Sequence, residues 1–263
     1  APLVLLVGDP DRADLAAERL VSREPPIHVR GYRLHTGVYE GHPLSVLCTG
    51  MGAGAMEIAL VELCQIVAQP VLIRCGSCGA LQPDIALGDL ILSQGALRLE
   101  QASLGYVEAG YPALAHPEAV MALSRAADEQ GRVHHLGITA TAPGFYGAQG
   151  RDVGALGLAS AEPELLARLL RQGVLNLEME ASILLTLATR LGLRAGVVCA
   201  AFANRSTGAF LDSRGRARAT EGCLDVGFAA LLELDRMADL RGERPCWHPG
   251  LQALPPPKGR TEI

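Results

Sequence analysis

Short apolar runs alternate along the chain with longer segments whose apolar residues recur at helical spacing. The runs end at glycine, proline or polar residues and predict buried strands at 3–7, 33–39, 44–49, 71–75, 89–94, 133–141, 175–177 and 194–202. The helical spacing predicts helices over 55–67, 117–131, 162–172, 180–191 and 216–240. This alternation indicates an α/β fold with a central, partly parallel sheet.

The pattern runs without an internal repeat or a linker until residue 242. We therefore expect one domain over residues 1–241. The remaining segment, 242–263, holds Pro245, Pro249 and the run Pro255-Pro-Pro257. This composition predicts a Pro-rich, irregular C-terminal tail.

Composition narrows the class of protein. With 263 residues, 49% of them hydrophobic, the chain can bury a large core. Its net charge of −5 and the lack of a basic run argue against a nucleic-acid polymer or an anionic membrane as a partner. No apolar stretch approaches the ~20 residues needed to span a bilayer, and no basic region precedes the first one. The odd number of cysteines, 7, indicates reduced thiols, so we expect a cytoplasmic protein.

Two segments that follow predicted strands are suited to an anion. Gly8-Asp-Pro-Asp-Arg12 follows the first strand, where backbone amides and an arginine can hold a phosphate group. Arg74 stands near the end of another apolar strand and is followed by small residues that include Ser77. A buried arginine is costly unless it meets an anion. The alternatives are a capped turn with a surface arginine for the first segment and a structural ion pair for the second.

The segment 145–151 combines an aromatic ring, a carboxamide and a guanidinium, on Phe145, Gln149 and Arg151. The carboxamide and the guanidinium can pair with the edge of a uracil ring while the aromatic side chain covers its face. An ordinary polar surface loop would have the same composition. Further along, Glu178 and Glu180 point the same way in an extended backbone, so both could reach the cis hydroxyls of one ribose. Alternatively, Glu180 caps the helix that follows.

Two other motifs are weak. Residues 50–55 fit the dinucleotide pattern G-x-G-x-x-A, but the next predicted strand carries no acid for an adenosine ribose. Cys75 and Cys78 form a C-x-x-C pair without a second pair at zinc spacing and without a helix after it.

Taken together, these segments resemble the nucleoside phosphorylase family, which includes uridine phosphorylases and hexameric purine nucleoside phosphorylases. The resemblance covers about residues 3–240 and includes Asn204-Arg205 as its last motif. It implies a single-domain α/β/α sandwich with a central mixed, partly barrel-like sheet. It also implies a homo-oligomer built from twofold dimers, either a dimer or a hexamer.

The resemblance implies a role for each matching residue. Phosphate would be held by Gly8, Arg12, Arg74 and Ser77, together with Arg30 of a neighbouring subunit. The ribose would contact Glu178, Met179 and Glu180, and the base would contact Phe145, Gln149, Arg151 and Arg205. The catalytic set would be Arg74, Glu180, Gln149 and Arg151. The implied reaction is phosphorolysis of a pyrimidine nucleoside, uridine foremost, with phosphate as co-substrate and no cofactor or metal.

Departures from the family pattern leave alternatives open. Purine-specific relatives have an aspartate where this chain has Asn204, which favours a pyrimidine, whereas Ser77-Cys78 is closer to the purine branch. Gly31 and Ala55 replace residues that help to bind potassium in some relatives, so we do not expect that ion. The N-terminal segment that lends a histidine to the neighbour's ribose site is expected to be missing. A purine nucleoside phosphorylase, a nucleosidase and a non-catalytic nucleoside-binding protein remain the alternatives.

Overall fold

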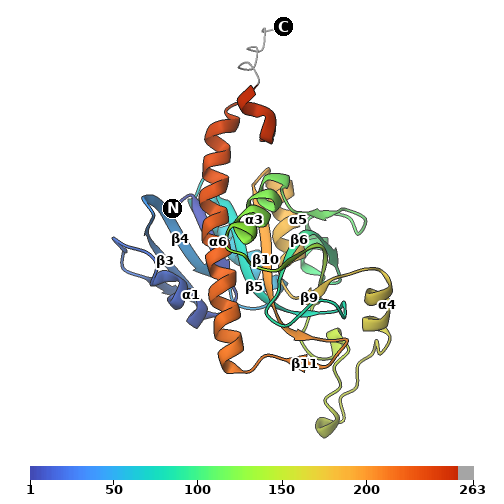
Figure 1. The fold of residues 1–263 in the computed structure, drawn as a ribbon. Helices are drawn as coiled ribbons and strands as arrows, with labels where there is room; N and C mark the ends of the chain where they lie inside the picture. The colour runs from blue at the N-terminus through green and yellow to red at the C-terminus, as the bar shows by residue number, and fades with distance from the viewer. Residues whose placement is uncertain (254–263) are drawn as a thin grey trace.

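The computed structural model describes residues 1–253 (Figure 1). The strands are β1 (Leu3–Val7), β2 (Ile27–Val29), β3 (Tyr32–Tyr39), β4 (His42–Cys48), β5 (Val71–Ala80), β6 (Leu90–Arg98), β7 (Ala113–Leu114), β8 (His134–Thr141), β9 (Asn176–Glu178), β10 (Ala195–Asn204) and β11 (Ala209–Phe210). The α-helices are α1 (Pro10–Ala17), α2 (Ala53–Ile66), α3 (Pro117–Glu129), α4 (Leu165–Arg171), α5 (Ala181–Leu191) and α6 (Ser213–Arg241). All the predicted strands and helices are present, with shifted ends.

Part of the mixed sheet closes on itself. Its strand order is β11-β10-β6-β8-β9-β5-β1-β4-β3-β2, and β10 also pairs with β5. The ring β10-β6-β8-β9-β5 is therefore closed, while β1, β4, β3 and β2 continue outward from β5 as an open sheet. Parallel pairs such as β1–β5 and β10–β5 stand beside antiparallel pairs such as β5–β9 and β10–β6. The prediction of a mixed, partly barrel-like sheet is confirmed.

Helices cover both faces of the sheet because its central strands are apolar on both sides. In β1, Leu5 and Val7 belong to a core that α1, α3 and α6 cover. The alternate residues Val4 and Leu6 belong to a second core, covered by α2 and α5. Figure 1 shows the long α6 lying across the first of these faces. The single-domain α/β/α sandwich is thus confirmed.

Strand β5 is longer than the sequence predicts. The apolar run ends at Cys75, but the strand continues to Ala80 because β10 pairs with it along almost its whole length. Arg74 therefore lies within a strand, and the glycines that follow it belong to the sheet. At Gly76, a Cβ atom would lie 1.9 Å from Nη1 of Arg74, so a glycine is required for this guanidinium to lie along the strand.

Four elements of the structure, α1, β2, β7 and β11, were not predicted from the sequence. Helix α1 replaces the expected loop after β1. Asp9 caps it by accepting a hydrogen bond from the amide of Arg12 at 3.0 Å, and Pro10 occupies its first turn. This combination is a recognised start signal for a helix. Strands β2, β7 and β11 have only two or three residues each and are wholly or partly exposed, so they leave no hydrophobic pattern.

The tail begins where α6 ends, at Arg241. Up to residue 253 it is irregular apart from one short 3₁₀ turn, Pro249–Ala253. The amide of Trp247 donates to the buried carboxylate of Glu118 at 2.8 Å, so this part of the tail packs on the domain. The run Pro255-Pro-Pro257 lies outside the described residues. Within residues 1–253, no helix has the length and apolar character that a membrane span requires.

Candidate active site

One cavity of about 380 Å³ lies where β1, β9 and β10 end beside the second half of β5. Ligands of α/β proteins bind at such positions, because loops and helix N-termini that follow the strands converge there. The cavity is lined by most of the residues that the resemblance singles out, namely Gly8, Arg12, Arg74, Ser77, Phe145, Gln149, Arg151, Glu178, Met179 and Glu180. Two predicted residues, Arg30 and Arg205, do not line it.

Arg12 enters the cavity from the first turn of α1. Its Nη1 donates to the carbonyl of Cys75 at 3.3 Å, and its guanidinium lies 5.9 Å from the centroid of the Phe202 ring. Gly8 precedes the same helix N-terminus, where free amides and the helix dipole favour an anion. The helix that the sequence analysis missed therefore supplies one side of the predicted phosphate site.

Arg74 is only 3% exposed, and its charge is met by two carboxylates. Its Nη2 is hydrogen-bonded to Oε2 of Glu180 and lies 3.7 Å from Oε2 of Glu178. Burial lowers the pKa of Arg74, but the two carboxylates outweigh it and raise that pKa above its usual value. Its Nε is buried and has no hydrogen-bond partner among residues 1–253. The structural ion pair considered above is thus present, and one donor of the guanidinium remains free.

The two glutamates beside Arg74, Glu178 and Glu180, have different hydrogen-bond partners. Glu178 accepts hydrogen bonds from the amide of Glu180 at 2.8 Å, from that of Ala181 at 2.9 and 3.0 Å, and from Oγ1 of Thr141 at 2.6 Å. Glu178, and not Glu180, therefore caps helix α5. Burial, ahead of the opposing effect of Arg74, raises the pKa of Glu178.

Glu180 makes no capping hydrogen bond, and its Oε1 accepts from the amide of Gly52 at 2.5 Å. Its carboxylate lies between that amide and Arg74. Both glutamates were predicted to reach the sugar. Glu180 fits this prediction better than Glu178, because the oxygens of Glu178 already accept hydrogen bonds from backbone amides and from Thr141.

Arg12 and Arg74 line what we call the anion end of the cavity. Phe145, Gln149 and Arg151 line the other end, which we call the base end. The guanidinium of Arg151 lies 4.5 Å from the centroid of the Phe145 ring, and burial lowers its pKa. Gln149 is 3% exposed, and it lines the cavity. A short 3₁₀ turn, Gly147–Gln149, and a left-handed Gly150 with φ of 67° bend the segment. The aromatic, carboxamide and guanidinium groups of the predicted base site are therefore close together.

Arg205 lies directly behind this end. A Cβ atom on Gly79, which lines the cavity, would lie 3.1 Å from Cγ of Arg205. Its Nη2 donates to the backbone carbonyl of Gln149 at 3.0 Å, and its Nη1 is buried without a partner among the described residues. Burial, reinforced by repulsion from Arg151, lowers the pKa of Arg205 to about 10.

Asn204 has a structural role. Its Nδ2 donates to the carbonyls of Gln82 and Ile85 at 2.9 Å each, and its Oδ1 accepts from the amides of Ser206 and Thr207 at 3.0 and 3.2 Å. It does not line the cavity. Its hydrogen-bonding capacity is thus used to hold the loop between β5 and β6.

Several lining residues were not predicted. They are Asp9, Met51, Cys78, Gly79, Leu177, Phe202, Ala203, Phe210, Leu211 and Arg216. Phe202 lies at an irregularity of β10, where the register to β5 shifts between Ala201 and Ala203. No strand periodicity can indicate such a side chain, because the irregularity changes which face it occupies.

Arg30 lies in the turn between β2 and β3, away from the cavity of its own chain. It has φ of 51°, its side chain is 77% exposed, and its Nη1 lies 4.0 Å from Oε1 of Glu62. It lines an apolar groove of about 380 Å³ between this hairpin and α2, together with Ile27, Val29 and Ile66.

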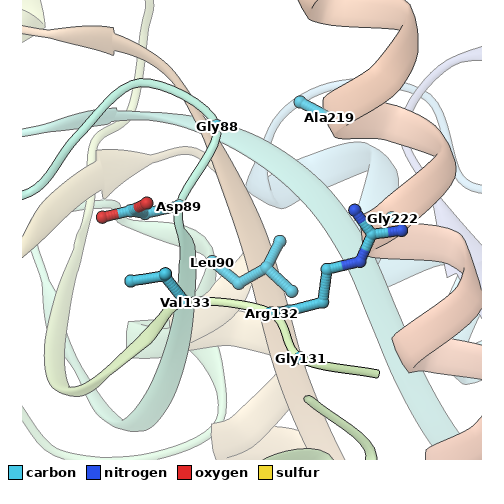
Figure 2. A pocket seen from close by; sticks show the side chains of 8 residues that line it. All are labelled: Gly88, Asp89, Leu90, Gly131, Arg132, Val133, Ala219 and Gly222. Atoms are coloured by element: carbon cyan, nitrogen blue, oxygen red, sulfur yellow. The ribbon is translucent and has the colours of Figure 1, made fainter. Parts of the chain in front are cut away.

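A third, smaller cavity of about 210 Å³ lies beside α6 and holds none of the predicted site residues (Figure 2). Its charged groups are engaged elsewhere. Arg132 lies 3.5 Å from Oδ2 of Asp225, and the carboxylate of Asp89 turns away and pairs with His135 at 2.8 Å. In the described part of the chain, no group of three or more His, Cys, Asp or Glu residues is placed to hold a metal ion.

The fold and the cavity define an α/β protein in which one pocket is lined by Arg12 and Arg74 and by the aromatic, carboxamide and guanidinium groups of residues 145–151. A model of the phosphorylase superfamily matches residues 2–221, and the chain belongs to that superfamily.

Individual relatives show the same likeness. The chain is 45% identical over 259 residues to a uridine phosphorylase of Thermococcus kodakarensis, covering 96% of this chain and 90% of the relative. It is 35% identical over 207 residues to a uridine phosphorylase of Haemophilus influenzae, covering 78% and 82%. It is 30% identical over 232 residues to a DeoD-type purine nucleoside phosphorylase of Roseobacter denitrificans, covering 88% and 94%.

Proposed function

We propose that this protein catalyses the phosphorolysis of a pyrimidine nucleoside, with uridine as the foremost substrate, to the free base and a pentose 1-phosphate. One observation carries the proposal: a single cavity is lined by residues suited to bind an anion, a sugar and a pyrimidine base. The names of relatives such as the uridine phosphorylase of Thermococcus kodakarensis support the same reaction.

The anion end would hold phosphate as the nucleophile. Arg12, Arg74 and Ser77 would orient it, with the amides at the start of α1. Correct orientation of a nucleophile contributes several kcal/mol to catalysis. The free Nε of Arg74 is available to phosphate while its Nη2 stays with Glu180.

Glu180 would accept hydrogen bonds from the sugar hydroxyls, beside Met179. As the glycosidic bond lengthens, positive charge develops on the sugar and is stabilised by the adjacent phosphate. Negative charge develops on the departing base, where Gln149 and Arg151 can donate hydrogen bonds. The reaction then needs neither a metal nor an organic cofactor.

Purine phosphorolysis is the second candidate, and two relatives support it. The chain is 32% identical to a guanosine phosphorylase of Halorubrum lacusprofundi, in addition to the DeoD-type relative. The base end favours a pyrimidine because Asn204 faces the β5–β6 loop and the charged groups nearest the base end are arginines. Among residues 1–253, the carboxylates that line the cavity are those of Asp9, Glu178 and Glu180, and none of them belongs to the segment 145–151.

We also infer that the protein acts in the cytoplasm as a homo-oligomer built from twofold dimers. Arg30 stands on an exposed turn beside an apolar groove, which suits a residue that completes the phosphate site of a neighbouring subunit. Arg30→Ala and Glu180→Ala proteins should each be weakly active. Mixing them should restore activity, because one of the two sites in a hybrid dimer is intact. An active monomer in light scattering would contradict this inference.

The reaction is tested by incubating the protein with uridine, with and without phosphate, and following the release of uracil. Release that requires phosphate identifies a phosphorylase. Release without phosphate identifies a nucleosidase, and binding without release identifies a nucleoside-binding protein. Inosine and cytidine in the same assay decide between the two candidate base classes.

A further inference from the structure

A chain of buried polar groups leads from the segment after β6 to the anion end of the cavity. It begins at Glu100, which is 2% exposed. The hydrogen bonds that this carboxylate accepts within residues 1–253 come from neutral groups, namely the amide of Ser103 at 3.0 Å, the hydroxyl of Ser103 at 2.5 Å and the hydroxyl of Ser182 at 2.8 Å. Burying a carboxylate is costly even when it is hydrogen-bonded. The arrangement therefore holds Ser182, in the first turn of α5, at a fixed place.

The next link in the chain has a defined hydrogen-bond direction. The amide of Ser182 donates to Oγ1 of Thr141 at 2.9 Å, and Oγ1 of Thr141 lies 2.6 Å from Oε1 of Glu178. An amide can only donate, so the Thr141 oxygen accepts there and its single proton points to Glu178. Both Ser182 and Thr141 are fully buried, so water does not compete for these bonds.

The two oxygens of Glu178 have different surroundings. Oε1 accepts from Thr141 and from the amide of Ala181 at 3.0 Å, whereas Oε2 faces Nη2 of Arg74 at 3.7 Å, beyond hydrogen-bond distance. Burial raises the pKa of Glu178, while Arg74 and the hydrogen bond from Thr141 lower it. The Thr141 hydroxyl thus favours an ionised carboxylate that is held on α5, near Arg74 but apart from it.

On the basis of the proposed function, we propose that Thr141 is a positioning residue for phosphate binding. Its hydroxyl keeps the carboxylate of Glu178 away from Arg74, so that Nη2 of Arg74 stays with Glu180 and Nε stays available to phosphate. Without this hydroxyl, Oε1 of Glu178 keeps only the amide of Ala181. The carboxylate then turns toward Nη2 and draws the guanidinium away from the phosphate. Thr141 does not line the cavity, so its effect passes through Glu178.

The test is the phosphorolysis of uridine by Thr141→Val at varied phosphate concentration, since valine has the shape of threonine but no hydroxyl. We expect the KM for phosphate to rise about tenfold, as for the loss of one hydrogen bond to a charged group, and the KM for uridine to change by less than about twofold. Thr141→Ser keeps the hydroxyl and should restore the KM for phosphate. Thr186→Val is the matched control, because the hydroxyl of Thr186 is buried in α5 and has no partner among the described residues.

The route through Glu178 is tested in a second background. In Glu178→Gln, the side chain has no charge to draw Arg74, so adding Thr141→Val should not change the KM for phosphate further. A rise of equal size in both backgrounds would show that Thr141 acts independently of Glu178 and would overturn the proposal.

An unchanged or lowered KM for phosphate in a folded Thr141→Val protein would also overturn the proposal. If that variant fails to fold, Ser182→Ala takes its place. It releases the turn whose amide orients the Thr141 hydroxyl, so the KM for phosphate should still rise, and an unchanged value would count against the proposal. Wild-type protein that releases no uracil with phosphate present would end the proposed function and this proposal together, whereas an active wild type with unaffected variants ends this proposal alone.

Discussion

The two ends of the cavity hold their arginines in opposite ways. At the anion end, Arg74 is buried between Glu180 and Glu178, and its charge is balanced within the protein. At the base end, Arg151 and Arg205 have no carboxylate partner in the described residues and repel each other. The anion end is therefore organised before any ligand binds, whereas the base end keeps an electrostatic cost that a ligand can relieve. Functional sites commonly retain such a cost.

The largest effect is expected from removing Arg74, the arginine whose charge is balanced by two carboxylates. Arg74→Ala leaves Glu178 and Glu180 as adjacent buried carboxylates, and loss of one partner of a buried ion pair costs about 3–5 kcal/mol of stability. The loss of a charge-assisted contact to phosphate should also weaken its use by about ten- to a hundredfold, or 1.5–3 kcal/mol. Thermal unfolding and phosphate saturation curves measure the two effects. An unchanged saturation curve in a folded variant would show that Arg74 does not bind phosphate.

The next largest effect distinguishes the roles of Glu178 and Glu180 at the anion end. Glu178→Gln should cost about 1–2 kcal/mol of stability, because a carboxamide oxygen replaces only part of the α5 cap. It should change the kcat/KM values for uridine and 2′-deoxyuridine by a similar factor. Glu180→Gln should instead change the ratio between these two substrates, since Glu180 is the carboxylate available to the sugar hydroxyls. A shift of that ratio in the Glu178 variant would assign Glu178 to the sugar.

A smaller effect is expected at Gly76. A Cβ atom there would lie 1.9 Å from Nη1 of Arg74, so Gly76→Ala should displace the guanidinium. We expect the apparent phosphate affinity to fall about tenfold, as for the loss of one hydrogen bond to a charged group. Gly54→Ala is the matched control, since nothing lies within 4 Å of a Cβ atom at that glycine. Equal phosphate affinities for the two variants would remove the proposed role of Gly76.

The smallest effect, of opposite sign, is expected at the base end. Arg205→Gln should stabilise the fold by on the order of 1 kcal/mol, after discounting for partial solvent exposure, while it lowers activity. The pKa of Arg205 is lowered to about 10 in the folded protein, so folding disfavours its charged form below that pH. The penalty shrinks as pH rises through about 10, and the advantage of the variant should shrink with it. Urea unfolding at pH 7 and above pH 10 measures this; an advantage that grows with pH would contradict it.

Most of the fold could be predicted from the sequence because its strands are strongly apolar and its helices are periodic. The continuous apolar runs in β1 and β5 predict the central sheet, and most of the family motifs line the cavity. The extension of β5 to Ala80 could not be predicted, because it depends on pairing with β10, distant in sequence. Helix α1 could have been predicted from Asp9 and Pro10.

The roles of individual site residues were harder to predict. Spacing shows that Glu178 and Glu180 are near each other, but not which of them caps α5. Asn204 was expected to bear on base specificity, yet its amide is used to hold a loop. The repulsion between Arg151 and Arg205 also has no sequence signal, since the two residues come from different parts of the chain.

The central claim is that phosphate bound beside Arg74 attacks the sugar, while the base departs beside Gln149 and Arg151. Phosphorus NMR of the protein with uridine and inorganic phosphate tests it most directly. The account predicts a new sugar 1-phosphate resonance that grows in step with free uracil, and no uracil when phosphate is omitted. Uracil that accumulates without a new phosphate ester would contradict the account.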